Sequence, residues 1–283
     1  MRFGLNIVPV RPGDLGAVAV RAEELGFESL WTGEHVLTPV RLGDGYPGPT
    51  GKPPFSPDSR FLEPFAALTY LSAVTSRVRL GTGVIILPLH SPAAIARAIV
   101  TVDVLSAGRL TLGVGVGWMR EEFEAAGQDF TNRGRRTDEM ISFLDTVFAE
   151  RRPSFDGEFY HLPEVGFEPK PVQRPRPPLL IGGTGPAALR RAARSGDGWI
   201  GGNQAPPRIA ETVAEIRELR AENGGDGRPF EVTVILGWGQ RYEADLVQAY
   251  AAAGVDRLMV TPWARSSEAM SAIEQFARDA RLA

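Results

Sequence analysis

The sequence predicts an α/β fold, a single (β/α)8 TIM barrel over residues 1–283 with inserted loops at its C-terminal face. Short β-branched runs alternate with longer amphipathic stretches along the chain, which is the pattern of a parallel sheet covered by helices. Eight such pairs can be counted in the 283 residues. Because a barrel of eight βα units typically occupies about 250 residues, the number of repeats and the length agree.

The predicted strands are short, apolar and spread evenly along the chain. Their number favours a closed barrel over a doubly wound sheet, which usually has fewer strands. They are Arg2–Val8, Glu28–Gly33, Val78–Ile86, Leu110–Val116, Leu179–Gly182, Gly198–Gly201, Phe230–Leu236 and Arg257–Thr261.

Each strand is followed by a stretch with the apolar spacing of a helix. Start signals agree with this, since Ser91 and Pro92 supply a capping residue and a first-turn proline before the third helix. The expected helices are Leu15–Leu25, Pro64–Thr75, Ala93–Leu105, Arg120–Glu150 with a break near Asn132, Ala187–Ser195, Arg208–Asn223, Ala244–Ala253 and Ser267–Leu282.

Two segments are too long for ordinary connections. Val36–Leu62 carries six prolines and four glycines, and Pro153–Pro178 carries seven prolines and an expected hairpin at Phe155–Glu158. Segments of this length are functional lids or disordered inserts. Because the loops that follow strands form the catalytic face of a barrel, we expect Val36–Leu62 to cap an active site.

Composition narrows the classes of function. A net charge of -3, from 31 basic and 34 acidic residues along the whole chain, gives no footprint for nucleic acid or an anionic membrane. The chain has no cysteine, and its three histidines are far apart in sequence, so we expect no metal site. Leu80–Leu89, the longest nearly apolar stretch, is too short to cross a bilayer. The N-terminus lacks a signal-peptide pattern, and we expect a cytoplasmic protein.

Gly182, Gly183 and Thr184 follow an apolar strand and precede Gly185-Pro186 at the start of a helix. A turn of this kind exposes backbone N–H groups that can bind a phosphate. Gly183–Ala188 also fits the GxGxxA dinucleotide pattern. The alternative is that the glycines only form a tight turn.

Two other strands contain glycines at alternate positions. Leu112–Trp118 has three of them, which would let a flat ligand or another backbone approach closely. The alternative is barrel packing that needs small residues, with Trp118 as a core aromatic side chain. Leu80–Val84 indicates an irregular, glycine-containing strand, for which packing and function weigh equally.

Polar residues at a strand end and a helix start are further candidates. Glu34 and His35 end the second strand, at the catalytic rim of a barrel, and histidine is well suited to proton transfer near neutral pH. A structural histidine is the alternative. The basic cluster Thr131–Arg136 opposes the dipole of its helix, which predicts an anionic partner, either a protein carboxylate or a ligand phosphate.

Taken together, these motifs resemble the luciferase-like monooxygenase superfamily of flavin- or deazaflavin-dependent barrel enzymes. The resemblance covers nearly the whole chain, and the order and spacing of its motifs are specific. The motifs are WTGEH, GTGV, SAGRLTLGVGVGW, RGRRTDE, PKPVQRPRPPLLIGGTGP and ARSGDGWI.

The resemblance implies a flavin-like ring over the C-terminal mouth of the barrel. It implies a non-prolyl cis peptide at Gly83-Val84 behind the ring, and places Glu34 and His35 toward the ring or the substrate. In one deazaflavin-dependent sugar-phosphate dehydrogenase branch a glutamate follows the strand-four glycines, whereas Trp118 stands there in this chain. The cofactor-binding residues expected on this basis are Thr82, Gly83, Val84, Gly115, Val116, Gly117, Trp118, Gly182, Gly183 and Thr184.

The resulting prediction is an oxidoreductase that transfers hydride between coenzyme F420 and a small organic substrate under Val36–Leu62. His35 and Glu34 are the predicted catalytic residues. The alternatives are an FMN-dependent monooxygenase of the same superfamily, a non-catalytic flavin-binding protein, and a cofactor-free lyase whose glycine loop binds a substrate phosphate. Related proteins are often homodimers, which makes a homodimer an expectation here.

Overall fold

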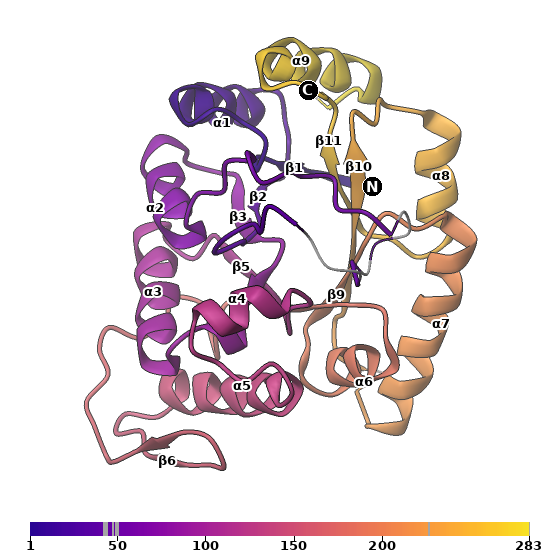
Figure 1. Cartoon of the computed structure of the whole chain (residues 1–283). Helices are drawn as coiled ribbons and strands as arrows, with labels where there is room; N and C mark the ends of the chain where they lie inside the picture. Colours follow the sequence, from indigo (N-terminus) through magenta and orange to yellow (C-terminus); the bar gives the residue numbers. More distant parts are fainter. Residues whose placement is uncertain (42–44, 47, 49–50, 226, 283) are drawn as a thin grey trace.

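The computed structural model describes residues 1–41, 45–46, 48, 51–225 and 227–282, and there it forms a closed barrel of parallel strands inside a ring of helices (Figure 1). The ring closes where Arg2 pairs with Arg257. This confirms the predicted (β/α)8 barrel. The eight barrel strands are β1 (Arg2–Asn6), β2 (Ser29–Thr32), β3 (Arg79–Thr82), β5 (Leu110–Gly115), β8 (Leu179–Gly182), β9 (Gly198–Gly201), β10 (Glu231–Trp238) and β11 (Arg257–Thr261).

The outer helices follow the strands in sequence order. Prolines occupy the first turn of four of them, at Pro64, Pro92, Pro186 and Pro206, where the missing N–H costs nothing. No helix in the described ranges is both long and apolar enough to cross a membrane. The helices are α1 (Leu15–Glu24), α2 (Pro64–Val74), α3 (Pro92–Leu105), α4 (Arg120–Ala125), α5 (Arg133–Ala149), α6 (Pro186–Ser195), α7 (Pro206–Glu222), α8 (Ala244–Ala252) and α9 (Ala269–Ala280).

The centre of the barrel is filled mainly by one large side chain. Trp31 is fully buried and packs with Leu180, Ile200 and Met259 inside the barrel. A Cβ atom on Gly81 would lie 2.3 Å from the Trp31 ring. The glycine on β3 therefore provides the space that the indole on β2 occupies.

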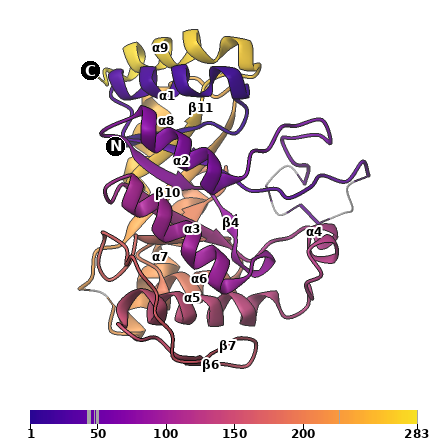
Figure 2. The same ribbon diagram turned by 90° about the vertical axis from the view of Figure 1, so that its left-hand side faces the viewer.

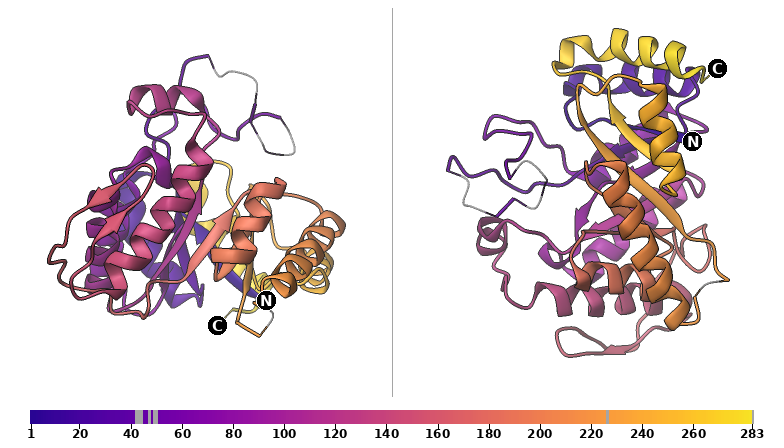
Figure 3. Two further views of the ribbon diagram at one scale, coloured as in Figure 1. Left: turned by 90° about the horizontal axis from the view of Figure 1, so that it is seen from below. Right: turned by 90° about the vertical axis from the view of Figure 1, so that its right-hand side faces the viewer.

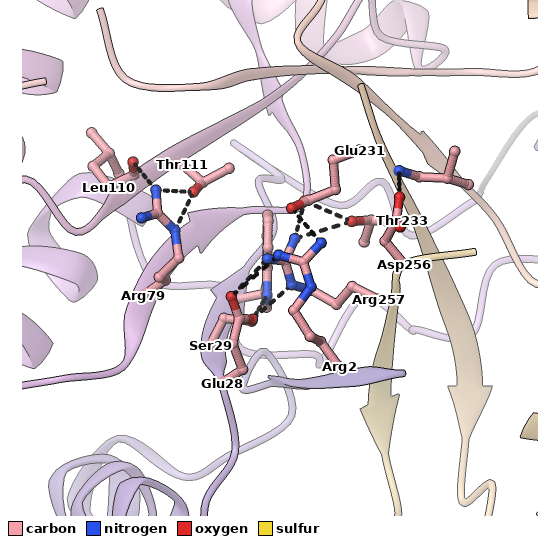
Figure 4. Close-up of polar contacts among 12 residues, drawn as sticks. Arg2, Glu28, Ser29, Arg79, Leu110, Thr111, Glu231, Thr233, Asp256 and Arg257 are labelled. Carbon is pink, nitrogen blue, oxygen red and sulfur yellow. Dashed lines mark hydrogen bonds and ion pairs between the residues drawn. The ribbon is translucent and has the colours of Figure 1, made fainter. Parts of the chain in front are cut away.

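Charged side chains close the N-terminal mouth (Figure 4). Arg257 is 1% exposed, donates two hydrogen bonds of 2.8 Å to Glu28, and also pairs with Glu231. Arg2 forms a second ion pair with Glu231 at 2.8 Å. These contacts join β1, β10 and β11 to the start of β2, so the barrel is plugged at the end opposite the predicted site.

The predicted strand Val78–Ile86 is interrupted in the structure. β3 ends at Thr82, a cis peptide joins Gly83 to Val84, and the short β4 (Ile85–Ile86) pairs with β5. The cis bond implied by the resemblance is therefore confirmed. Two backbone hydrogen bonds to β2 and the residues after it hold this bend: Gly83 N donates to Thr32 O, and Glu34 N donates to Val84 O.

The two long inserts have different places in the fold. The loop after β2 and α4 project together from one end of the barrel, whereas both termini lie toward the other end (Figure 3, left). This is the face predicted for Val36–Leu62, of which residues 42–44, 47 and 49–50 lie outside the described part.

The second insert runs along α5 and contains the hairpin β6 (Phe155–Asp156) and β7 (His161–Leu162) (Figure 2). Its backbone donates to Glu139 of α5 at Phe159 N and Tyr160 N, both at 2.8 Å. The expectation of a lid or a disordered insert is wrong for this segment, because an outer helix holds it in place.

Candidate active site

Bare backbone forms the floor of the C-terminal mouth. Alternate residues of a strand share a face, and the last positions of several strands carry no side chain. Cβ atoms placed on Gly115 and Gly182 would lie 2.9 and 3.0 Å from side-chain carbons of Val84. The structure thus brings together three residues predicted for the cofactor site, Val84, Gly115 and Gly182, from three different strands or their extensions.

A buried hydroxyl group at the C-terminal end of a barrel strand has no partner in the described part of the chain. Thr261 follows Arg257 and Met259 on the inward face of β11, is fully buried, and its Oγ1 makes no hydrogen bond within the described residues. A buried hydroxyl group without a partner is costly in a folded protein. The C-terminal ends of the barrel strands thus carry glycines and one unpartnered hydroxyl group, which fits a flat ring whose edge carries polar atoms.

Other predicted site residues have structural partners. Thr82 Oγ1 donates to Gly113 O at 2.8 Å and accepts from Gly113 N at 2.9 Å, so its hydroxyl group joins β3 to β5. Gly117 has φ +79°, which favours glycine, and its carbonyl accepts a hydrogen bond from Arg133 Nε at 3.1 Å. Val116 and Gly117 are half-buried between the floor and Trp118.

The predicted phosphate loop lies between β8 and α6. Gly183 and Gly185 are exposed, and the N–H groups of residues 183–185 donate to no oxygen in the described part of the chain. Gly183 has φ +114°, and its carbonyl accepts a hydrogen bond from Trp199 Nε1 at 2.7 Å. The turn is therefore anchored through this carbonyl, and its N–H groups at the start of a helix lack an acceptor among the described residues, an arrangement that can bind an anion.

Glu34 lies beneath the mouth of the barrel. It is 7% exposed, accepts a hydrogen bond from Ile86 N at 2.7 Å, and contacts His90 Nε2 at 2.8 Å. Both carboxylate oxygens hold the segment after the cis peptide against β2. A catalytic role for Glu34 stays a prediction, and the contacts it makes position the floor.

His35 lies in an enclosure of aromatic rings. Its ring centroid is 4.4 Å from that of Phe55, 4.9 Å from that of Phe61 and 6.2 Å from that of Trp118. Trp118 also packs edge-on against Tyr46 at 5.4 Å. The loop after β2 thus places apolar side chains around an imidazole at the rim of the barrel, where they can exclude water from a small substrate.

A buried carboxylate that the sequence analysis did not single out contacts this histidine. Glu122 of α4 is 1% exposed, and its Oε1 lies 3.2 Å from His35 Nδ1 and 2.7 Å from Val36 N. The sequence shows three glutamates within four residues, Glu121, Glu122 and Glu124. Nothing in this run distinguishes the buried one, because the partner lies 87 positions away.

The basic cluster at the start of α5 has protein partners of two kinds. Arg135 pairs with the carboxylate of Glu158, as one of the two alternatives predicted. Arg133 and Arg136 instead donate to backbone carbonyls, those of Gly117 and Pro88 among them. The arginines therefore fix the segments that surround the floor.

Comparisons with known proteins identify the family of the chain. The luciferase-like monooxygenase family model matches residues 2–279. The Mycobacterium tuberculosis (strain H37Rv) protein named "Uncharacterized protein Rv0940c" is 36% identical over 219 residues, which cover 77% of this chain and 75% of that protein. A Kineococcus radiotolerans protein named F420-dependent glucose-6-phosphate dehydrogenase is 35% identical over 193 residues, which cover 67% of this chain and 52% of that protein.

A solved structure shares the fold at low sequence identity. The F420-dependent secondary alcohol dehydrogenase in complex with an F420-acetone adduct aligns with a TM-score of 0.78 and 16% identity over 97% of both chains. Because the family model covers almost all of the barrel and the Mycobacterium relative is 36% identical over three quarters of its length, the chain belongs to the luciferase-like monooxygenase family.

Proposed function

We propose that this protein is an oxidoreductase that binds coenzyme F420 and transfers hydride between it and a small organic substrate. The glycine floor around Val84 is the observation that carries the proposal. Glycines at the ends of two strands let the Val84 side chain pack against bare backbone, where it can support a flat ring, next to the segment that carries His35. The relative from Kineococcus radiotolerans, which is named for its F420 dependence, supports the deazaflavin.

Different residues of this chain would bind the cofactor and act on the substrate. Val84, Gly115 and Gly182 would support one face of the ring, and the outward N–H groups of residues 183–185 would hold a phosphate. When bound, the deazaflavin supplies a carbon that accepts or donates hydride. His35 would accept a proton from a substrate hydroxyl group, or return one to a carbonyl oxygen, inside the aromatic enclosure.

The enclosure also limits the substrate. Phe55, Phe61 and Trp118 surround His35 with apolar ring surface. An apolar surface of this kind suits a small neutral alcohol or carbonyl compound better than a phosphorylated sugar. Such a substrate differs from the phosphorylated sugar in the name of the Kineococcus relative.

Parallel equilibrium titrations with oxidised F420 and with FMN, followed by fluorescence, test the proposal. We expect saturable F420 binding at least about ten times tighter than FMN binding, which corresponds to about 1.4 kcal/mol. Tighter binding of FMN would indicate the flavin-dependent monooxygenase instead. Binding of neither cofactor would favour a cofactor-free lyase, and F420 binding without hydride transfer to any of a panel of small carbonyl compounds would indicate a binding protein.

A further inference from the structure

The contact between His35 and Glu122 determines which imidazole nitrogen carries the proton. The same oxygen of Glu122 lies 2.7 Å from Val36 N and 3.2 Å from His35 Nδ1. A backbone N–H group can only donate, and an ionised carboxylate oxygen can only accept. Both neighbours of this oxygen therefore act as donors, and the neutral imidazole holds its proton on Nδ1.

This assignment leaves Nε2 with a free lone pair. The described residues provide no hydrogen-bond partner for His35 Nε2, and the ring is enclosed by Phe55, Phe61 and Trp118. Only 13% of the side chain is exposed. A proton acceptor in an apolar enclosure, backed by a buried carboxylate, is the arrangement that general-base histidines use.

We propose that Glu122 is a positioning residue that fixes the Nδ1–H tautomer of His35 and presents Nε2 to the substrate. The role follows from the protein's own geometry, but its significance for catalysis rests on the proposed function. A purely structural role, in which Glu122 only holds the loop at Val36 N, accounts for one of its two contacts. Such a role would not require a defined tautomer of His35.

The other two histidines provide internal references. His90 contacts Glu34 through Nε2, at 2.8 Å, and thus has the opposite arrangement. His161 is exposed and contacts Asp156. Because the chain has three histidines, His90→Gln and His161→Asn variants are enough to assign every imidazole signal.

Long-range proton–nitrogen spectra of the ¹⁵N-labelled full-length protein test the tautomer. In the neutral state we expect a protonated Nδ1 and an unprotonated Nε2 at His35, with the reverse pattern at His90. In Glu122→Ala the Nδ1–H pattern of His35 should be lost. If that variant does not fold, Glu122→Gln preserves the side-chain shape, and its weaker neutral acceptor should move the Nδ1-bound proton upfield.

Glu124→Gln is the matched control, since it makes the same change on an exposed position of the same helix. It should leave the His35 spectrum unchanged. Three outcomes would overturn the inference: a proton on Nε2 of His35 in the unmodified protein, an unaltered tautomer in Glu122→Ala, or an unshifted Nδ1-bound proton in Glu122→Gln. F420 titration of the same samples reports separately on the proposed function, because loss of F420 binding leaves the tautomer measurement intact.

Discussion

At the scale of single residues, His35 is the side chain whose loss should affect chemistry more than folding. Its Nε2 has no hydrogen-bond partner among the described residues, and its ring lies at the rim of the barrel. Removal of a general acid or base typically lowers a rate about 10²- to 10⁴-fold. We expect His35→Ala to reduce single-turnover hydride transfer by at least about 10²-fold, with the F420 dissociation constant nearly unchanged.

The measurement uses the best substrate from a panel of small alcohols, with melting temperature recorded on the same preparation. His161→Ala, which changes an exposed histidine far from the mouth, is the control. Equal rates in His35→Ala and the unmodified protein would remove the imidazole from the reaction.

Glu23 shows how one carboxylate can hold a loop. It accepts backbone hydrogen bonds from Ser76, Arg77 and Val78 at distances of 2.6 to 3.1 Å. Burial raises the pKa of Glu23, but these hydrogen bonds outweigh it and lower the pKa to about 2 from the ordinary 4.5. The ionised form therefore stabilises the fold above about pH 4.5, and this stabilisation is lost as the pH falls toward 2.

We expect Glu23→Gln to lower the free energy of unfolding at pH 7 by about 1–2 kcal/mol, because solvent access reduces the value that the full pKa shift would give. Urea denaturation at pH 7 and at pH 3 measures the effect, which should shrink at the lower pH. Glu24→Gln, on the same helix and exposed, should be neutral. A Glu23→Gln effect that grows with acidity would contradict this explanation.

At the scale of elements, a substitution at the start of α6 can show whether the glycine turn binds a phosphate or is only structural. Gly185 is the N-cap residue of α6, has φ −76°, and has open space around its Cβ position. Aspartate and asparagine are both favourable N-caps, but only aspartate places a negative charge near a bound phosphate. We expect Gly185→Asp to weaken F420 binding about tenfold or more, equal to about 1.4 kcal/mol, without loss of stability.

Gly185→Asn is the neutral control and should bind F420 within about threefold of the unmodified protein, since a neutral side chain of this size adds no repulsion. Gly183 is a poorer place for this test, because its φ of +114° makes any side chain strained. Equal F420 affinities in the aspartate and asparagine variants would show that no phosphate lies at the helix start.

The elements could be predicted where local rules decide them. First-turn prolines and amphipathic spacing located α3 and α6 to within one residue, and the change of pattern near Asn132 located the break before α5. The glycines of Leu80–Val84 indicated an irregular strand, but residue types did not show where β3 would be interrupted, because Thr82 and Val84 are both favourable in strands. The cis peptide at Gly83-Val84 was expected only from the family resemblance.

Part of the candidate site could also be predicted from local rules. Gly115 and Gly182 stand out because glycine is unfavourable in a strand interior. The contact between His35 and Glu122 depends on how α4 returns over the barrel, which is a tertiary relation without a local signal.

At the scale of the whole molecule, Arg257 links strands from both ends of the chain. It forms paired hydrogen bonds with Glu28 and an ion pair with Glu231, while its own side chain is 1% exposed. Removing one partner of a buried ion pair typically costs about 3–5 kcal/mol. Because both carboxylates are about a quarter exposed, we expect Arg257→Met to cost about 2–4 kcal/mol at pH 7.

The pH dependence of this loss follows from Glu28. Burial raises the pKa of Glu28, but the hydrogen bonds from Arg257 and the attraction to its charge outweigh this effect, so that the pKa lies below the ordinary 4.5. This contribution to stability is present above pH 4.5 and is lost as the pH falls. The free energies of unfolding of Arg257→Met and of the unmodified protein should therefore become more similar in acid. Denaturation midpoints from pH 7 to 3 measure this, with Arg208→Met, an exposed arginine, as control. A constant difference across this range would exclude the ion pair as the cause.

The packing of Trp118 gives the molecule an optical reporter. Trp31, Trp199 and Trp263 are at most 2% exposed, so their emission should stay constant while the barrel is folded. Trp118 is half-buried and rests on Tyr46 and His35. Any movement of the loop away from the mouth would let water reach this indole and shift its emission to longer wavelength. Trp238, the last residue of β10, is also half-buried. Stopped-flow fluorescence of a Trp238→Phe variant could therefore time the entry of a substrate before its identity is known.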